Sequence, residues 1–153
     1  MKKIMTLFLT ILLGCFVLSG CTKDEILNHY NNAIQAIGSI ELTNSLVLKG
    51  KKEKGVDDYT GTYQADYKNF SDTEYLFGGT SIEREAGKEI AVTCTLNITS
   101  GVAKVFWISG DDDPVILIET EGTYRDTITL PDGGNYFGIE CSDFTGSVEL
   151  NIE

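Results

Sequence analysis

Four tyrosines have the residue type and the spacing that could bind a ligand. Tyr59, Tyr63 and Tyr67 recur every four residues, and Tyr75 follows eight residues later. In a strand, residues four apart lie on the same face, because successive side chains alternate between faces. Exposed aromatic rings present a large apolar surface with a polar tip, which suits stacking on sugars. The alternative, which the sequence favours, is that these rings form a stripe of the protein core.

Clustered acidic residues provide a second candidate site. Asp111, Asp112 and Asp113 stand together before Pro114. Ca²⁺ takes six to eight oxygen ligands, and carboxylates in a loop often supply them. The spacing does not match an EF-hand, so a solvated turn is the favoured alternative. Ca²⁺ is the only cofactor that the sequence suggests.

Residues for catalysis are scarce. His29 is the only histidine, and it precedes the part of the chain with strand-like patterns. A Ser-His or Cys-His pair therefore cannot be assembled on a β domain, and neither can a His-ligated metal site. Paired carboxylates have no specificity in a chain with 23 acidic residues. We therefore predict that the protein is not an enzyme, and a hydrolase is the least favoured hypothesis.

The negative charge of the chain excludes further classes of partner. The formal net charge is −11 at pH 7. Phosphate backbones and anionic headgroups repel such a chain, so nucleic-acid binding is not expected. The only basic cluster consists of Lys49, Lys51, Lys52 and Lys54. We interpret it as a solvated turn whose lysines prevent association of sheet edges, in preference to a patch that binds anionic polymers.

The N-terminus has the features of an export signal. Lys2 and Lys3 precede the apolar run 4–18, which is shorter than the roughly 18 residues or more of a spanning helix. The run closes with an aliphatic residue, two small residues and a cysteine, Leu18-Ser19-Gly20-Cys21. Together these features resemble the signal peptide and lipobox of bacterial lipoproteins.

The resemblance implies a lipid anchor on Cys21. It implies a thioether-linked diacylglyceryl group, cleavage before Cys21, and acylation of the new amino group, for example with palmitate. Two or more acyl chains anchor a protein stably. The implied location is the outer side of the cytoplasmic membrane, or the outer membrane if the host has one, because Thr22 replaces the Asp of a retention signal. A simple secretory leader or a retained signal anchor is the alternative.

Two cysteines besides Cys21 remain in the implied mature chain. Cys15 lies in the leader, which leaves Cys94 and Cys141. Both alternate with polar residues in apolar stripes, so we expect both to face the core. In an exported protein they could form a disulfide, which would stabilise the fold by about 4 kcal/mol in the chain-entropy model. Two free, buried thiols are the equally weighted alternative.

A helix is expected directly after the lipidated cysteine. Thr22 and Glu25 have the spacing of a capping box, and Gly38 suits the C-terminal cap. An apolar stripe at helical spacing lies between them, formed by Ile26, Leu27, Tyr30, Ala33, Ile34 and Ile37. We therefore divide the chain into a signal peptide (1–20), a lipidated cysteine with a membrane-proximal helix (21–40) and a further domain (41–153).

Domain 41–153 has the sequence pattern of a β-sandwich. Its apolar residues alternate with polar ones, and turn signals recur every eight to twelve residues. The expected strands are 46–48, 59–67, 74–77, 90–98, 102–109, 115–120, 124–130, 136–141 and 147–152. We predict one antiparallel sandwich, mainly β, with jelly-roll or immunoglobulin-like topology.

One cysteine and tryptophan pattern bears on the choice of topology. The order Cys94, Trp107, Cys141 is similar to the immunoglobulin pattern. However, Ile139 occupies the position at which that family has its corner tyrosine. Trp107 lies in the most apolar segment, so we expect it in the core.

Two functions fit these features. The first is a lipid-anchored, non-enzymatic binding or adhesion module for a carbohydrate or an envelope protein. The second is a structural or accessory subunit of a cell-envelope complex, which docks through the apolar stripe of the N-terminal helix. In both, the lipid anchor makes the contact with the membrane.

Overall fold

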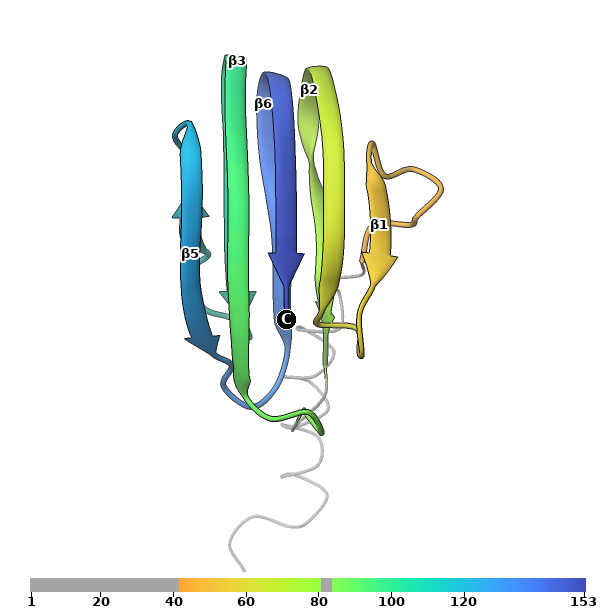
Figure 1. The fold of residues 1–153 in the computed structure, drawn as a ribbon, viewed down its shortest axis with the longest axis vertical. Helices are drawn as coiled ribbons and strands as arrows, with labels where there is room; N and C mark the ends of the chain where they lie inside the picture. The colour runs from red at the N-terminus through yellow and green to blue at the C-terminus, as the bar shows by residue number, and fades with distance from the viewer. Residues whose placement is uncertain (1–41, 81–83) are drawn as a thin grey trace, which may run out of the picture. The chain divides into compact units, whose positions relative to one another are not determined.

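The computed structural model describes residues 42–80 and 84–153, which form six strands. The strands are β1 (Lys51–Lys54), β2 (Gly61–Gly79), β3 (Glu89–Ser109), β4 (Val115–Ile118), β5 (Gly122–Thr129) and β6 (Asn135–Ile152). They pair in the order β1-β2-β6-β3-β4, and β5 also pairs with β3. Figure 1 shows β1, β2, β6 and β3 in this order, with β5 next to β3. The leader, Cys21 and the expected helix lie outside the described residues. Within the described ranges, no helix is long and apolar enough to cross a membrane.

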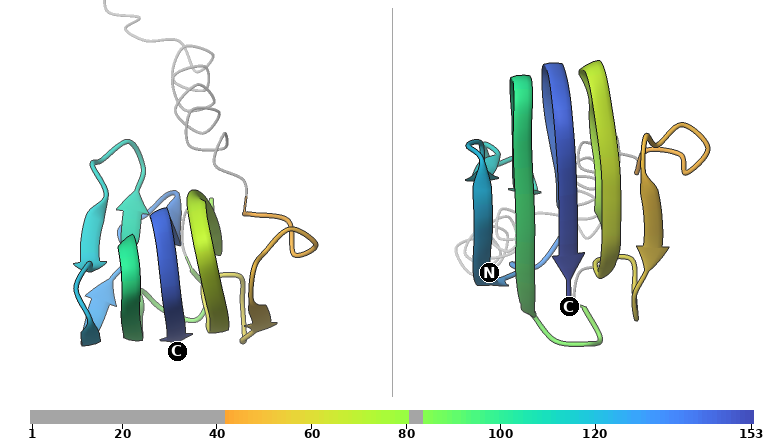
Figure 2. Two further views of the ribbon diagram at one scale, coloured as in Figure 1. Left: turned by 90° about the horizontal axis from the view of Figure 1, so that it is seen from above. Right: turned by 45° about the horizontal axis from the view of Figure 1, so that its top comes forward.

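Three strands are much longer than the rest, because each bends over and continues in a second layer. Strands β2, β3 and β6 contain 19, 21 and 18 residues. Their ribbons run side by side and curve over together at one end (Figures 1 and 2). Pairing between β2 and β6 shifts register at residues 67–72, and pairing between β3 and β6 shifts at residues 98–102. One continuous sheet is thereby folded into two facing layers.

The two layers contain different halves of the long strands. Layer A is ordered β1, 61–67 of β2, 146–152 of β6, 89–98 of β3, and β5. Layer B is ordered 72–79 of β2, 135–142 of β6, 102–109 of β3, and β4. If β1 is set aside, each layer has four members, and every long strand contributes to both. This is the arrangement of a jelly roll, so the β-sandwich prediction is confirmed and the immunoglobulin-like alternative is wrong.

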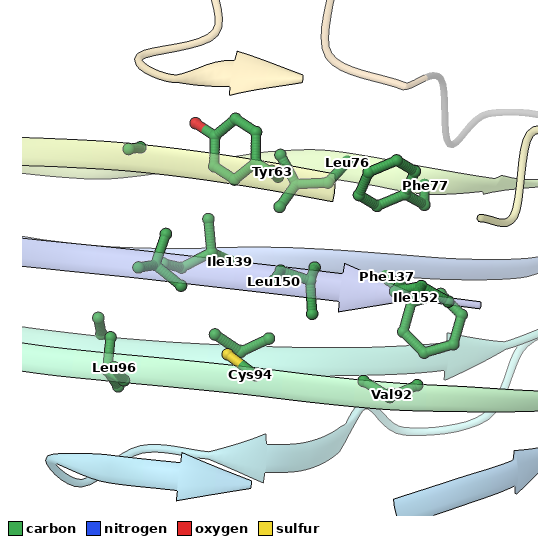
Figure 3. Close-up of a cluster of buried hydrophobic side chains, with 14 of the residues drawn as sticks. Tyr63, Leu76, Phe77, Val92, Cys94, Leu96, Phe137, Ile139, Leu150 and Ile152 are labelled. Carbon is green, nitrogen blue, oxygen red and sulfur yellow. The ribbon is translucent and has the colours of Figure 1, made fainter. Parts of the chain in front are cut away.

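Apolar side chains from both layers fill the space between them. The alternation that predicts half-buried strands is present in layer A, where Val92, Cys94 and Leu96 are fully buried. Figure 3 shows them facing side chains of β2 and β6. The other labelled members of this core are Tyr63, Leu76, Phe77, Phe137, Ile139, Leu150 and Ile152.

Hydrogen bonds link the bends of β2 and β6, and the bend of β3 lies close to that of β6. Asn69 of β2 and Asp143 of β6 both have positive φ angles of 48°. The Asn69 amide donates to Oγ1 of Thr145 at 3.0 Å, and the Asp143 amide donates to Oγ of Ser71 at 2.7 Å. The third bend has Gly101 at φ 76°. Each bend thus places a residue that tolerates a left-handed backbone beside the bend of its neighbour.

The structure corrects three details of the expected strand pattern. Residues 46–48 do not form the predicted strand, because 45–47 are a turn, and residues 51–54 of the lysine-rich segment expected to be a turn form the edge strand β1. The segment lies antiparallel to residues 61–64 of β2, so its lysines line the sheet edge. Several predicted strands are also halves of longer ones, since 90–98 and 102–109 both belong to β3.

The bend at Gly101 provides a test of this architecture. A Cβ on Gly101 would overlap the carbonyl oxygen of Asp143, and the positive φ angle adds about 1–2 kcal/mol of strain. We expect Gly101→Ala to lower the free energy of unfolding by about 2–4 kcal/mol in urea titrations. Gly110→Ala is the matched control, because Gly110 has φ 54° but open space around it. Equal losses in both variants would contradict the interlocked bends.

Candidate functional site

Three of the four candidate stacking tyrosines belong to the protein interior. Tyr59, Tyr63 and Tyr67 are at most 4% exposed. A ring that is covered by protein cannot stack on a ligand, so the stacking hypothesis is wrong for these three and the core alternative is confirmed. Tyr75 is half-buried, and its ring meets those of Phe106 and Tyr136 edge-on at 5.7 and 6.5 Å.

A buried carboxylate holds two of these tyrosines. Glu74 is 2% exposed, and its Oε2 accepts hydrogen bonds from the hydroxyls of Tyr63 at 2.8 Å and Tyr67 at 2.5 Å. Its Oε1 accepts the backbone amide of Lys49 at 2.8 Å, and the Gly50 amide donates to the Tyr63 hydroxyl at 3.0 Å. Burial, and after it the carboxylate of Glu74, raises the pKa of the Tyr67 hydroxyl far above its usual range. The network is therefore a structural clamp on residues 49–50, and it has no open side for a ligand.

The three aspartates of the predicted calcium site lie at the protein surface. Asp111, Asp112 and Asp113 are all exposed. Across residues 42–80 and 84–153, no three His, Cys, Asp or Glu side chains are placed to hold a metal ion. The calcium hypothesis for these aspartates therefore has no support in the described structure.

The lysines of the basic cluster are individually engaged. Lys49 lies over the ring of Phe70 at 5.2 Å, and Lys52 lies over the ring of Phe77 at 4.9 Å. Lys51 pairs with Glu53, and Lys54 pairs with Asp58 at 2.7 Å. Each of the four lysines thus has a local partner, and the position of three of them on an edge strand fits the edge-protecting interpretation.

Cys94 and Cys141 are both free and buried. Cys94 lies in layer A and Cys141 in layer B. Burial raises the pKa of each thiol to about 12, and for Cys141 the carboxylates of Glu74 and Glu140 contribute as well. Since the thiolate is the reactive form, neither residue is suited to catalysis. Trp107 is partly buried and stacks on Phe137, where the immunoglobulin pattern would have it pack on a disulfide.

The outer face of layer A carries a regular array of hydrogen-bonding side chains. Strand register aligns Thr62, Asn151 and Thr93 in one row across β2, β6 and β3. The next row contains Gln64, Glu149 and Thr95, and the Gln64 amide donates to Glu149 at 2.9 Å. Among the described residues, no side chain or backbone group bonds the hydroxyls of Thr62 and Thr93, so both remain available to a ligand.

These two rows line a hollow that continues toward one end of the sandwich. The hollow over the rows has a volume of about 250 Å³. A second hollow of about 370 Å³ shares Thr62 and Asn151 with it and reaches Val56. A third hollow of about 310 Å³ begins at Val56 and extends to Arg84 and Glu85. We call this succession the polar groove.

A partly buried ion pair organises the far end of the polar groove. The guanidinium Nε of Arg84 donates to Oδ2 of Asp57 at 2.6 Å, and the Arg84 side chain is only 8% exposed. Oδ1 of Asp57 accepts the hydroxyl of Thr60 at 3.0 Å and the amide of Tyr59 at 3.1 Å. Partial burial alone would raise the pKa of Asp57, but the hydrogen bonds from Arg84 and Thr60 hold it below its usual range. The pair ties the segment before β2 to the segment before β3.

The sequence contains a signal for part of this groove. In the two segments where apolar and polar residues alternate, the polar positions are predicted to face outward. These positions include Thr62 and Gln64 in one segment and Thr93 and Thr95 in the other. Periodicity does not predict the pairing register of the strands, which aligns these residues in rows with Asn151 and Glu149. The Asp57–Arg84 pair, which spans 27 residues, has no sequence signal at all.

Comparisons with known proteins find only distant structural similarity. No protein-family model and no curated protein matches the sequence. A carbohydrate-binding module of lichenase 5A from Cellvibrio mixtus, solved with cellotriose, aligns with a TM-score of 0.34 and 14% identity. The alignment covers 69% of this chain and 86% of that one.

Two further solved structures align at similar levels. The sugar-binding C-terminal domain of EclA has a TM-score of 0.34 at 15% identity, over 66% of this chain and 83% of that domain. The C-terminal module of the laminarinase LamC from Zobellia galactanivorans has a TM-score of 0.29 at 11% identity, over 69% and 88%.

The Asp57–Arg84 pair predicts a pH-dependent contribution to stability. Because the pKa of Asp57 is lowered by folding, its contribution is present above the ordinary value of about 4 and is lost as the pH falls through the folded-state pKa. At pH 7 we expect Asp57→Asn to reduce the free energy of unfolding by about 2 kcal/mol, measured with urea.

The matched control for this prediction is Asp58→Asn. Asp58 forms an exposed pair with Lys54, and such pairs contribute roughly 0–1 kcal/mol. The deficit of Asp57→Asn should shrink progressively below about pH 4, because the wild-type carboxyl is then protonated first in the unfolded chain and, at lower pH, in the folded one. A deficit that stays constant from pH 7 to pH 3 would count against the ion pair.

Proposed function

We propose that the protein is a lipid-anchored, extracytoplasmic carbohydrate-binding protein, and that the polar groove is its binding site. The observation that carries this proposal is the pair of cross-strand rows, which offers both hydrogen-bond donors and acceptors at the floor of an elongated hollow. No catalytic step is assigned to the site.

The chemistry of the groove matches that of sugar hydroxyls. A hydroxyl both donates and accepts, so it is best met by mixed groups such as the Asn151 amide, the Glu149 carboxylate and the threonine hydroxyls. Glu149 is already oriented by the bond from Gln64, and a carboxylate makes stronger hydrogen bonds than a neutral acceptor. Val56, which is 85% exposed where the hollows meet, adds an apolar contact for a ring face.

The shape and charge of the groove narrow the class of ligand. Adjacent hollows that share lining residues suit a section of a polymer better than an enclosed small molecule. The groove is lined by the carboxylates of Glu53, Asp58, Glu85, Glu149 and Glu153. Its two cations, Lys54 and Arg84, already form ion pairs with Asp58 and Asp57. Like charges repel, so a neutral or amino-sugar polymer is the expected ligand and an anionic polymer is not.

The carboxylates also favour binding over hydrolysis. A glycosidase needs a carboxylic acid with a raised pKa to protonate the leaving oxygen. In the groove, the pKa of Asp57 is lowered, and a hydrogen bond from Lys51 together with its charge lowers the pKa of Glu53. Both groups are thus held in the form that accepts hydrogen bonds.

The anchor part of the proposal depends on the lipobox-like residues 18–21. A lipid tether would keep the binding site at the envelope surface, where an extended polymer can reach it. The acidic chain gains nothing from anionic headgroups, so acyl chains would supply the attachment.

Binding should depend on the outward hydroxyls of the first row. In affinity electrophoresis or calorimetry on glycans selected from an array, Thr62→Val combined with Thr93→Val should weaken binding about 10-fold or more, since each lost hydrogen bond is worth roughly 0.5–1.5 kcal/mol. Thr127→Val on β5 is the matched control, because Thr127 is exposed on the same face but lies outside the groove.

Glu149→Gln should weaken binding more strongly, because it removes the charge of an acceptor while keeping its shape. All three variants should retain the unfolding transition of the wild type. A full-length chain that binds no glycan on the array, or binds equally after both groove changes, would contradict the proposed site.

The anchor has its own test. Cys21→Ser should leave the precursor unprocessed or release the protein from the membrane fraction, as judged by metabolic labelling with a palmitate analogue and fractionation. Normal processing with full membrane retention and no label would refute lipidation without bearing on glycan binding.

A further inference from the structure

The edge strands β1 and β4 differ in how well their composition protects them against pairing with another chain. A free strand edge presents unpaired N–H and C=O groups, and proteins commonly protect such edges with lysines. Strand β1, at the edge of layer A, has three lysines in four residues. Strand β4, at the edge of layer B, reads Val115-Ile116-Leu117-Ile118 and has no charged residue.

The β4 edge is open within the described part of the chain. β4 pairs only with residues 105–107 of β3, so no described strand lies along its other side. Leu117 and Ile118 pack against the core, whereas Val115 is 50% exposed and Ile116 is 40% exposed. An apolar strand with one open edge and exposed side chains is the geometry that a protein uses to accept an additional strand.

Acidic residues border this apolar edge on both sides. Asp111, Asp112 and Asp113 precede β4, and Glu119 and Glu121 follow it, all exposed. The sequence has no Lys or Arg between residues 105 and 124. A second strand laid along β4 would therefore have each of its ends beside carboxylates.

We propose that the free edge of β4 is a docking site for an extended segment of a partner protein with basic residues on both sides of an alternating apolar core. The segment would add a strand to layer B through backbone hydrogen bonds, while its basic ends meet the aspartates and glutamates. This surface is separate from the polar groove, which involves β1, β2, β3 and β6, and the inference does not depend on glycan binding.

Charge complementarity distinguishes this partner from a second copy of the chain. Two copies that paired through β4 would bring two identical acidic borders together, and like charges across an interface disfavour association. A basic segment gains from the same carboxylates. The contact covers about four residues, roughly 13 Å of strand, so it should be weak and dependent on salt.

A pair of synthetic peptides tests the inference. The probe is acetyl-Lys-Lys-Val-Thr-Val-Thr-Lys-Lys-amide, and the control has Glu in place of each Lys. Each is titrated into the ¹⁵N-labelled full chain in zwitterionic detergent. We expect shifts in the amide signals of Val115 to Ile118, and at least 10-fold tighter binding of the basic peptide at low salt, with the difference reduced in 0.5 M NaCl.

Two variants separate edge pairing from general charge attraction. Ile116→Lys places a cation on the exposed edge and should weaken binding of the basic peptide at least 10-fold. Leu46→Lys adds the same charge at an 89% exposed position in the turn before β1 and should leave the affinity nearly unchanged. Comparable unfolding transitions would show that both variants are folded.

Three results would overturn the inference. One is equal affinity for the basic and acidic peptides, and another is a set of shifted signals that excludes β4. The third is concentration-dependent dimerisation in sedimentation experiments that Ile116→Lys abolishes, which would make a second copy the occupant of the edge.

Discussion

The interlocked bends of β2, β3 and β6 are the constraint on which the rest of this domain depends. A single strand that folds over would break its pairing with straight neighbours, so the three central strands must bend at the same level. The reciprocal bonds between residues 69–71 and 143–145 join two of the bends, and Gly101 lets the third approach the backbone of Asp143. Both layers and the core between them follow from that shared fold.

The bends also decide which residues can reach a ligand. Since every long strand runs through both layers, its inward positions in layer A and in layer B face one another and close the core. Polar positions of layer A, such as Thr62, Thr93 and Asn151, are left on an outer face in aligned rows. The short strands β1 and β4 then form edges in different layers, and the two edges differ in composition, lysine-rich in β1 and apolar in β4.

Much of this architecture can be predicted from the pattern of the sequence, because alternation reports which face of a strand is buried. The inward placement of Val92, Cys94 and Leu96 follows in this way, and so does the mainly β class. Alternation could not reveal that 90–98 and 102–109 are one bent strand, since turn-like residues at 99–101 look the same in a loop and in a bend. It also could not reveal the burial of Glu74, because nothing in the pattern around this carboxylate shows that the hydroxyls of Tyr63 and Tyr67 will bond to it.

The candidate site was less accessible to prediction than the fold, for a related reason. The spacing of the tyrosines suggests ligand contacts, yet Tyr63 and Tyr67 donate hydrogen bonds to the buried carboxylate of Glu74. The groove is lined instead by threonines and an asparagine that belong to no motif. Which residues line the groove is decided by cross-strand register, which brings together residues about 30 to 90 positions apart.

The most direct test of the central claim is to map amide signals of the ¹⁵N-labelled full chain during titration with neutral linear hexasaccharides such as cellohexaose and chitohexaose. The account predicts that shifts concentrate at Thr62, Gln64, Thr93, Glu149 and Asn151 and extend toward Val56. Saturable shifts confined to other surfaces, or none with any glycan that the array identifies, would contradict it.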